Sequence, residues 1–204
     1  MKGTKVQFSQ PEIDLMYNAE VILTKNKVVE KMKLMLEDLQ TEMMEYAGET
    51  KLALSQHDFF QNNPKISKGE NYLGLPYLIL DYPRKFDQEN ILTVRTMFWW
   101  GNFFSITLHL AGSFKNKLEQ KIANKYYLLA DSDYYIGINE DPWVHHFEES
   151  NYALVSQMSS EKFSRFCTKA AHLKIATKMP LNGVTTKFET LLMHWKLLVD
   201  VCFY

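Results

Sequence analysis

The sequence has few cysteines, no excess of charge of either sign and no long apolar run, and each shortage excludes a class of protein. Its 204 residues include only two cysteines, Cys167 and Cys202, without a CxxC pair or a metal-ligand spacing. A scaffold stabilised by disulfides would need more cysteines in a shorter chain. We therefore expect both residues to be small buried side chains in a reducing compartment, the cytoplasm.

The charges are nearly balanced, with 23 Lys and Arg against 24 Asp and Glu. A phosphate backbone selects a broad positive field, so nucleic-acid binding is disfavoured. No run of about eighteen apolar residues occurs, and residues 1–20 lack the continuous apolar segment of a secretory signal. We expect a soluble protein that binds neither nucleic acid nor membrane.

The sequence also lacks motifs that would indicate a particular reaction. The chain has no glycine-rich phosphate loop after a predicted strand, no G-x-S-x-G sequence and no internal repeat. We expect no cofactor, and the sequence favours a binding protein over an enzyme.

What the sequence does contain is material for a large core, with 46% hydrophobic and 14% aromatic residues. Ser9 followed by Pro11 predicts a helix start, and that helix should continue to about residue 24. A second helix is predicted between Asn26 and Gly48, with apolar residues on one face and charges on the other. Residues 1–50 thus form a helical region whose apolar stripe suits core packing or a homodimer interface; the stripe includes Met32, Met35, Met43 and Met44.

From residue 75 to residue 204 the sequence predicts a sheet with covering helices. The segment 56–74 is interpreted as a long connection, and Pro83 is expected to end the first strand because proline cannot donate to a ladder. We predict strands at 78–82, 91–100 and 103–110, a helix at 113–124, short strands at 126–130, 133–138 and 152–157, a helix at 160–171, a strand at 172–179 and a long helix after Gly183.

These elements predict one α+β domain that spans residues 1–204. It would consist of an N-terminal helical pair, a mostly antiparallel meander sheet and a long C-terminal helix packed on one face of the sheet. The hairpin at 91–110 is its most clearly marked part, because Gly101 and Asn102 readily adopt the positive φ angles of tight turns.

That turn predicts a register in which Trp99 lies opposite Phe104 and Trp100 opposite Phe103. The face with Trp99 would belong to the core under a helix, with Arg95 reaching water or a carboxylate. The other face would be mixed, with aromatic, hydroxyl and imidazole groups, as in a pocket for a small molecule or a partner segment. Its candidate ligand-binding residues are His109, Thr96, Thr107, Phe98, Trp100 and Phe103, and the neighbouring strand could add Asp81 or Tyr82.

The same mixed face has a simpler interpretation. Threonines are good strand formers, and aromatic pairs stabilise hairpins, so it could be an ordinary half-exposed sheet surface.

A second candidate lies in the acidic segment 131–148. A hydrolase or metal-dependent enzyme could use His145, His146 and Glu148 with a carboxylate from Asp131, Asp133 or Asp141. Adjacent histidines diverge in regular structure, so they would share a metal ion only in an irregular loop. The alternatives are a solvated acidic loop and a purely structural or assembly role.

Overall fold

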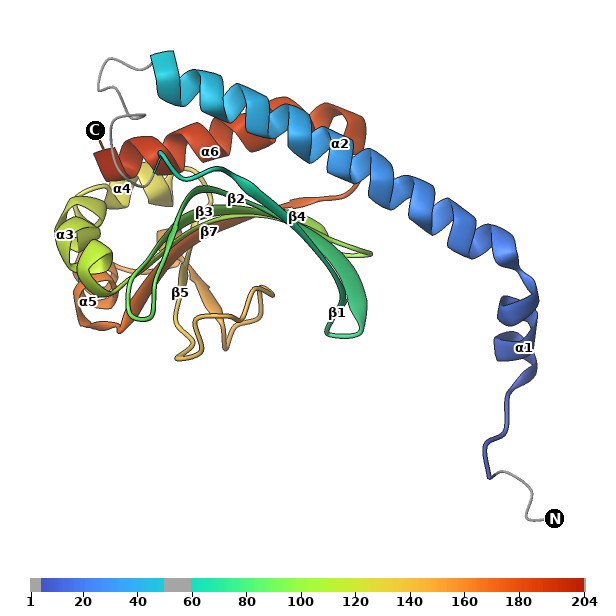
Figure 1. Cartoon of the computed structure of the whole chain (residues 1–204). Coiled ribbons are helices and arrows are strands. Elements are labelled where there is room, and N and C mark those ends of the chain that lie inside the picture. The colour runs from blue at the N-terminus through green and yellow to red at the C-terminus, as the bar shows by residue number, and fades with distance from the viewer. Residues whose placement is uncertain (1–4, 50–59, 204) are drawn as a thin grey trace.

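A curved antiparallel sheet forms the centre of the molecule (Figure 1). The computed structural model describes residues 5–49 and 60–203. Within them the strands are β1 (Lys65–Tyr72), β2 (Leu75–Phe86), β3 (Ile91–Trp99), β4 (Phe103–Ala111), β5 (Tyr135–Gly137), β6 (Tyr152–Leu154) and β7 (His172–Pro180). They pair in the order β1-β2-β3-β4-β7-β5-β6, so β1 to β4 form the predicted meander and β7 is inserted before β5.

The helices cover one face of this sheet and its margin. They are α1 (Gln10–Tyr17), α2 (Ala19–Glu49), α3 (Gly112–Ala123), α4 (Tyr126–Ala130), α5 (Ser160–Lys169) and α6 (Lys187–Phe203), with short 3-10 turns at Val155–Gln157 and Val184–Thr186. None of the helices in the described ranges is long and apolar enough to cross a membrane. The predicted α+β class, including the closing C-terminal helix, is confirmed.

The main core lies between α2, α6 and the sheet face beneath them, which we call the helix face. Apolar residues of α2 repeat at threes and fours, as an amphipathic helix requires. Leu36 and Met43 of α2 and Trp195 of α6 are completely buried there, and the Trp195 indole donates a hydrogen bond to the carbonyl of Tyr82. Cys167 and Cys202 are buried as predicted, and neither forms a disulfide.

Several predicted elements have different bounds. The segment 56–74, predicted as a connection, contains the strand β1 at residues 65–72. Its first residues, 56–59, lie outside the described residues. Pro83 lies inside β2, at a bulge between Asp81 and Arg84 where the ladder needs no donor. The break between the first two helices is at Asn18, not near residue 24, and only the first half of the predicted strand 152–157 is a strand.

Residues 126–130 form the helix α4 where a strand was predicted. A five-residue apolar segment can adopt either form, and here the Lys125 carbonyl accepts a hydrogen bond from the Leu129 amide. Leu129 is the buried residue of this turn, and the Tyr126 hydroxyl donates to the Met158 carbonyl at 2.5 Å. Tertiary contacts therefore decide the conformation.

The predicted register of the hairpin is wrong by one residue. The loop between β3 and β4 has three residues, 100–102, so Trp99 pairs with Phe103 and Thr93 with His109. The predicted register assumes a loop with an even number of residues. A loop with an odd number shifts the pairing by one residue, so the side chains of β3 point to the opposite face from the one predicted. Thr96 and Phe98 consequently belong to the helix face, whereas Arg95 belongs to the other.

Gly112 begins α3 with a positive φ of 59°, and a Cβ atom there would lie 2.5 Å from the Glu89 carbonyl. We predict that Gly112→Ala destabilises the protein by about 1–3 kcal/mol, because both the backbone angle and the contact are unfavourable. Urea unfolding monitored by circular dichroism measures this. Gly48→Ala is the matched control, since its Cβ would meet nothing within 4 Å; an equal loss in both variants would contradict the explanation.

Candidate functional site

The second face of the sheet carries buried polar side chains under the segment 138–151, and we call it the loop face. Asp81 of β2 and Arg95 of β3 are cross-strand partners there. Arg95 donates twice to the Asp81 carboxylate, from Nε to Oδ1 at 2.8 Å and from Nη2 to Oδ2 at 2.9 Å. Since both side chains are largely buried, this bidentate pair is a strong, geometrically specific contact.

Arg95 also holds the covering segment on the sheet. Its Nη1 lies 3.0 Å from His145 Nε2, and because a guanidinium can only donate, the imidazole accepts there. Burial, followed by the nearby charges of Arg95 and Lys174, lowers the pKa of His145 to about 3. The Tyr72 hydroxyl accepts from the His145 amide at 2.6 Å, which holds the backbone of this residue, while the lowered pKa keeps its ring neutral.

Lys174 of β7 is a second buried cation on this face, with 0% of its surface exposed. Its Nζ donates to the Val144 carbonyl at 2.5 Å and lies 5.0 Å from the centre of the Tyr152 ring. Burial lowers the pKa of Lys174 to about 8. Gly137 leaves the room for this stem, since a Cβ there would lie 3.1 Å from Lys174 carbons.

His109 lies beside these cations and is 1% exposed. Burial is the main cause that lowers its pKa to about 2, so the ring is neutral. Its Nε2 is buried without a hydrogen-bond partner in the described part of the chain. The ring contacts Trp143 and His172, with centroids 5.5 and 5.9 Å away, and through His172 it adjoins a hollow at the margin of the sheet.

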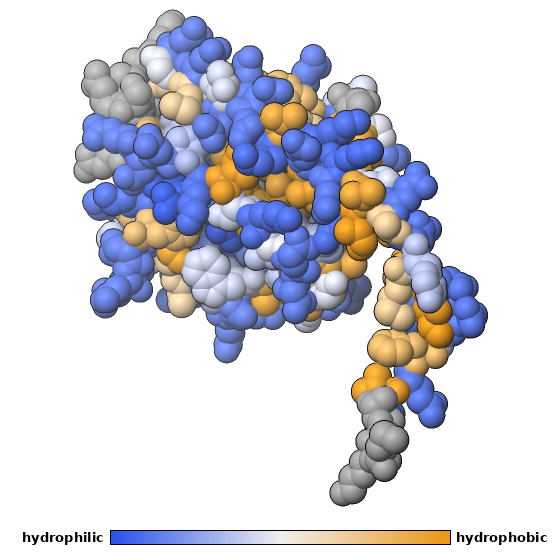
Figure 2. Space-filling model, turned by 45° about the vertical axis from the view of Figure 1, so that its right-hand side comes forward, coloured by the Kyte–Doolittle hydropathy of each residue, from blue (hydrophilic) through white to orange (hydrophobic). Residues whose placement is uncertain are grey.

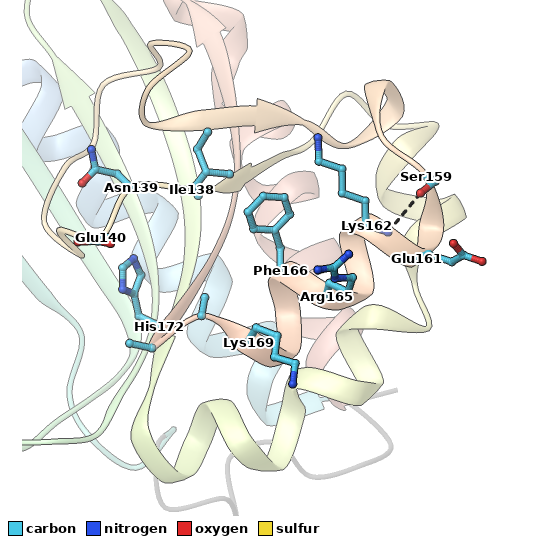
Figure 3. Close-up of a pocket in the computed structure, with 13 residues that line it drawn as sticks. Ile138, Asn139, Glu140, Ser159, Glu161, Lys162, Arg165, Phe166, Lys169 and His172 are labelled. Carbon is cyan, nitrogen blue, oxygen red and sulfur yellow. Dashed lines mark hydrogen bonds between the residues drawn. The ribbon is translucent and has the colours of Figure 1, made fainter.

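This hollow, which we call the α5 pocket, has a volume of about 920 Å³ and is shown in Figure 3. One wall is α5, and the opposite wall is residues 137–140 at the end of β5. Phe166 and Ile138 contribute apolar surface, and His172, at the start of β7, lies at the end nearest the sheet. Burial lowers the pKa of His172, so this ring is also held towards its neutral form.

Three cations line the α5 pocket, because Lys162, Arg165 and Lys169 follow one another at helical spacing. None of them forms an ion pair with a described carboxylate. Two carboxylates also border the hollow: in Figure 3 Glu161 points away from Phe166, and Glu140 lies near His172 on the other wall. The pocket therefore combines an apolar surface, a cationic wall and a separate acceptor.

The residues predicted as one ligand-binding face are divided by the true register. His109, Thr107 and Phe103 lie on the loop face, whereas Thr96 and Phe98 are buried on the helix face. Trp100 lies in the turn and packs against the helix-face core. Phe103 contacts Trp99 and Phe147 at the aromatic end of the loop face, far along the strand from His109.

Of the predicted set, His109 therefore lies nearest the α5 pocket. Neither His172 nor the α5 cations are marked as site residues by the sequence pattern. The spacing of the three α5 cations is also that of an ordinary solvated helix face, so it does not indicate a site. The opposite wall of the pocket comes from residues 137–140, which are distant in the sequence.

The acidic segment does not assemble the predicted metal ligands. His145 Nε2 faces Arg95, while His146 lies 3.0 Å from the Tyr72 hydroxyl through Nδ1 and 3.6 Å from Glu148 through Nε2. Across residues 5–49 and 60–203, no three His, Cys, Asp or Glu side chains are grouped as metal ligands would be. The proposed carboxylates lie elsewhere: Asp131 and Asp133 follow α4, and Asp141 accepts from the Trp143 amide.

The fold and the hollow define a single α+β domain with a pocket between a helix and the margin of its sheet. No protein-family model, no curated protein and no solved structure matches the chain.

Proposed function

We propose that this protein binds, without chemical conversion, a small organic anion with an apolar body in the α5 pocket. The observation that carries the proposal is the placement of three unpaired cations, Lys162, Arg165 and Lys169, beside the apolar side chains of Phe166 and Ile138. Small-molecule sites combine mostly apolar walls with a few polar groups that fix orientation. The volume of about 920 Å³ is within the usual range for such ligands.

The acid group of the ligand would be bound by Arg165 and Lys162. A guanidinium binds a carboxylate or phosphate through two parallel hydrogen bonds, which orients the ligand as well as attracting it. The apolar body would then lie over Phe166, in the direction of His172. Glu140, on the opposite wall, offers an acceptor for a hydroxyl or amine at the far end of the ligand.

A cytoplasmic location and a homodimer also remain proposals. The first is supported by Cys167 and Cys202, which are buried in apolar surroundings that raise the pKa of each thiol to about 12. The second is supported by apolar side chains that α1 and α2 leave exposed.

Octanoate is a suitable probe because it joins a carboxylate to an unbranched apolar chain. Isothermal titration should detect octanoate binding, and Arg165→Ala should weaken it about tenfold, as expected for the loss of one charge-assisted contact. Octanol, which has the same chain without the charge, should bind more weakly than octanoate to the native protein.

Lys117→Ala is the matched control, since Lys117 is an exposed cation on α3 outside the pocket lining. It should leave octanoate affinity unchanged. Equal affinities for octanoate and octanol, or equal losses in the two variants, would contradict a cationic site on α5.

A further inference from the structure

The N-terminal arm, residues 8–24, projects away from the body of the protein (Figure 1). It comprises α1 and the first turns of α2, and every residue from Asn18 to Thr24 is exposed. Just beyond the arm, Lys25 of α2 forms an ion pair with Glu70 of β1. Figure 2 shows apolar side chains along the arm; the large exposed ones are Phe8, Leu15, Met16, Tyr17, Val21, Ile22 and Leu23.

Such an arm is not expected to be stable in isolation. The helix α1 has only 8 residues, and helices shorter than about 12–15 residues are marginal in water unless an apolar face packs against something. Contiguous exposed apolar surface of this kind usually marks an interaction site. The arm therefore needs a partner surface outside its own helix pair.

A matching surface exists on the same chain between α4 and α6. This groove, of about 500 Å³, is lined by Leu128, Leu192, Met193 and Leu197. Leu128 and Met193 are 44% and 54% exposed, so the groove is open and presents apolar side chains to solvent. We call it the α4–α6 groove.

One chain cannot bring its own arm to its own groove. The arm projects from one side of the molecule, while α4 lies on the opposite side (Figure 1). The helix α2, which separates them, is 31 residues long, or about 46 Å. A second copy is needed to join the two surfaces.

We propose that the protein forms a two-fold dimer in which each N-terminal arm packs into the α4–α6 groove of the other copy. A closed pair of identical contacts covers both arms and both grooves without leaving a surface for further growth. The seven exposed side chains of one arm offer roughly 100 Å² each, so the arm sides of the two contacts alone contribute on the order of 1,400 Å², and the groove surfaces that they cover add to this. A stable interface needs about 1,600 Å² in total, counting both partners.

Charge permits a second copy and disfavours a membrane. The arm carries the carboxylates Glu12, Asp14 and Glu20 and no Lys or Arg. The groove is lined by two cations, Lys125 and Lys196, and two carboxylates, Glu189 and Asp200, so its charges balance and do not repel the acidic arm. Helices that bind anionic membrane surfaces are instead rich in Lys and Arg, so a lipid surface is disfavoured as the occupant.

Cross-linking between two separately tagged copies tests this contact. One copy carries Met16→Cys or Ile22→Cys in the arm, and the other carries Met193→Cys in the groove. The native cysteines are buried and should not compete. After oxidation we expect a product of twice the 24.0 kDa chain that contains both tags, formed at least about tenfold more than with Leu73→Cys, because docking raises the effective concentration of the two thiols.

Leu73 is 62% exposed in the turn between β1 and β2, outside both surfaces, which makes it the matched control. If neither arm cysteine exceeds this control, the arm does not occupy the groove and the proposal fails.

A second measurement is the mass in solution by sedimentation equilibrium. The native protein should be dimeric, and both Ile22→Asp and Met193→Asp should be monomeric while retaining octanoate binding in the α5 pocket. A monomeric native protein, a dimer that survives both substitutions, or an arm that binds anionic vesicles instead would overturn the proposal. None of these results bears on the α5 pocket, whose test is the octanoate titration.

Discussion

Replacing Asp81 with alanine should destabilise the protein by about 3–5 kcal/mol, the usual effect of removing one partner of a buried ion pair. The guanidinium of Arg95 would remain buried without its carboxylate. It would then face the second buried cation, Lys174, without a carboxylate of its own to balance its charge. Thr93 would also lose the acceptor of its hydroxyl, at 3.4 Å. Urea unfolding at neutral pH measures the loss.

The loss of stability in Asp81→Ala should arise because Arg95 is left as an unpaired buried charge, and not because the ion pair itself contributes much stability. The double variant Asp81→Leu/Arg95→Met removes both charges and keeps apolar volume, so it should be more stable than Asp81→Ala, although His145 then loses its donor. A double variant less stable than the single variant would contradict this explanation, and would mean that the pair contributes net stability.

Acid should unfold the protein through its buried histidines. Burial lowers the pKa of His109 to about 2 and that of His145 to about 3, against 6.5 for an exposed imidazole. Below pH 6.5 the unfolded chain binds protons that the folded chain does not, so stability falls with pH until these folded pKa values are reached. Each histidine should contribute a loss approaching about 1.4 kcal/mol per pH unit.

Together, protonation of the two rings would lower the free energy of unfolding by about 4–5 kcal/mol between pH 6.5 and about pH 4.5. This is a large part of a typical stability of about 5–15 kcal/mol. Urea midpoints across this range measure the effect. His109→Leu should reduce the slope by up to about 1.4 kcal/mol per pH unit, since one histidine that stays neutral in the folded protein is gone. An unchanged slope in this variant would show that His109 does not stay neutral in the folded protein.

The fold could be predicted where local pattern and burial agree. The apolar positions of α2 and α6 recur at helical spacing, and the hairpin turn at Gly101 is marked by its residue types. The strand β1 could not be predicted because it is an edge strand with little burial, which needs only backbone pairing with β2. The register depended on one loop residue, and residue types alone do not distinguish a loop of two from a loop of three.

The candidate site was less predictable than the fold. The sequence predicts Arg95 on the core face, where it reaches water or a carboxylate, and offers Asp81 or Tyr82 as a neighbour of His109 on the other face. In the structure Arg95 pairs with Asp81, because the one-residue difference in register moves Arg95 to the face that carries His109. The α5 pocket joins α5 to residues 137–140 through tertiary packing, which no local pattern in either segment encodes.

Crystals of the protein with 8-bromooctanoate test the proposed function most directly, because anomalous scattering locates the bromine without prior assumptions. We predict the carboxylate within hydrogen-bond distance, about 3 Å, of the Arg165 guanidinium. The bromine should lie between Phe166 and His172, and Arg165→Ala should remove its signal from the α5 pocket. A bromine bound at another surface, with the α5 pocket empty in the same crystal, would contradict the proposal.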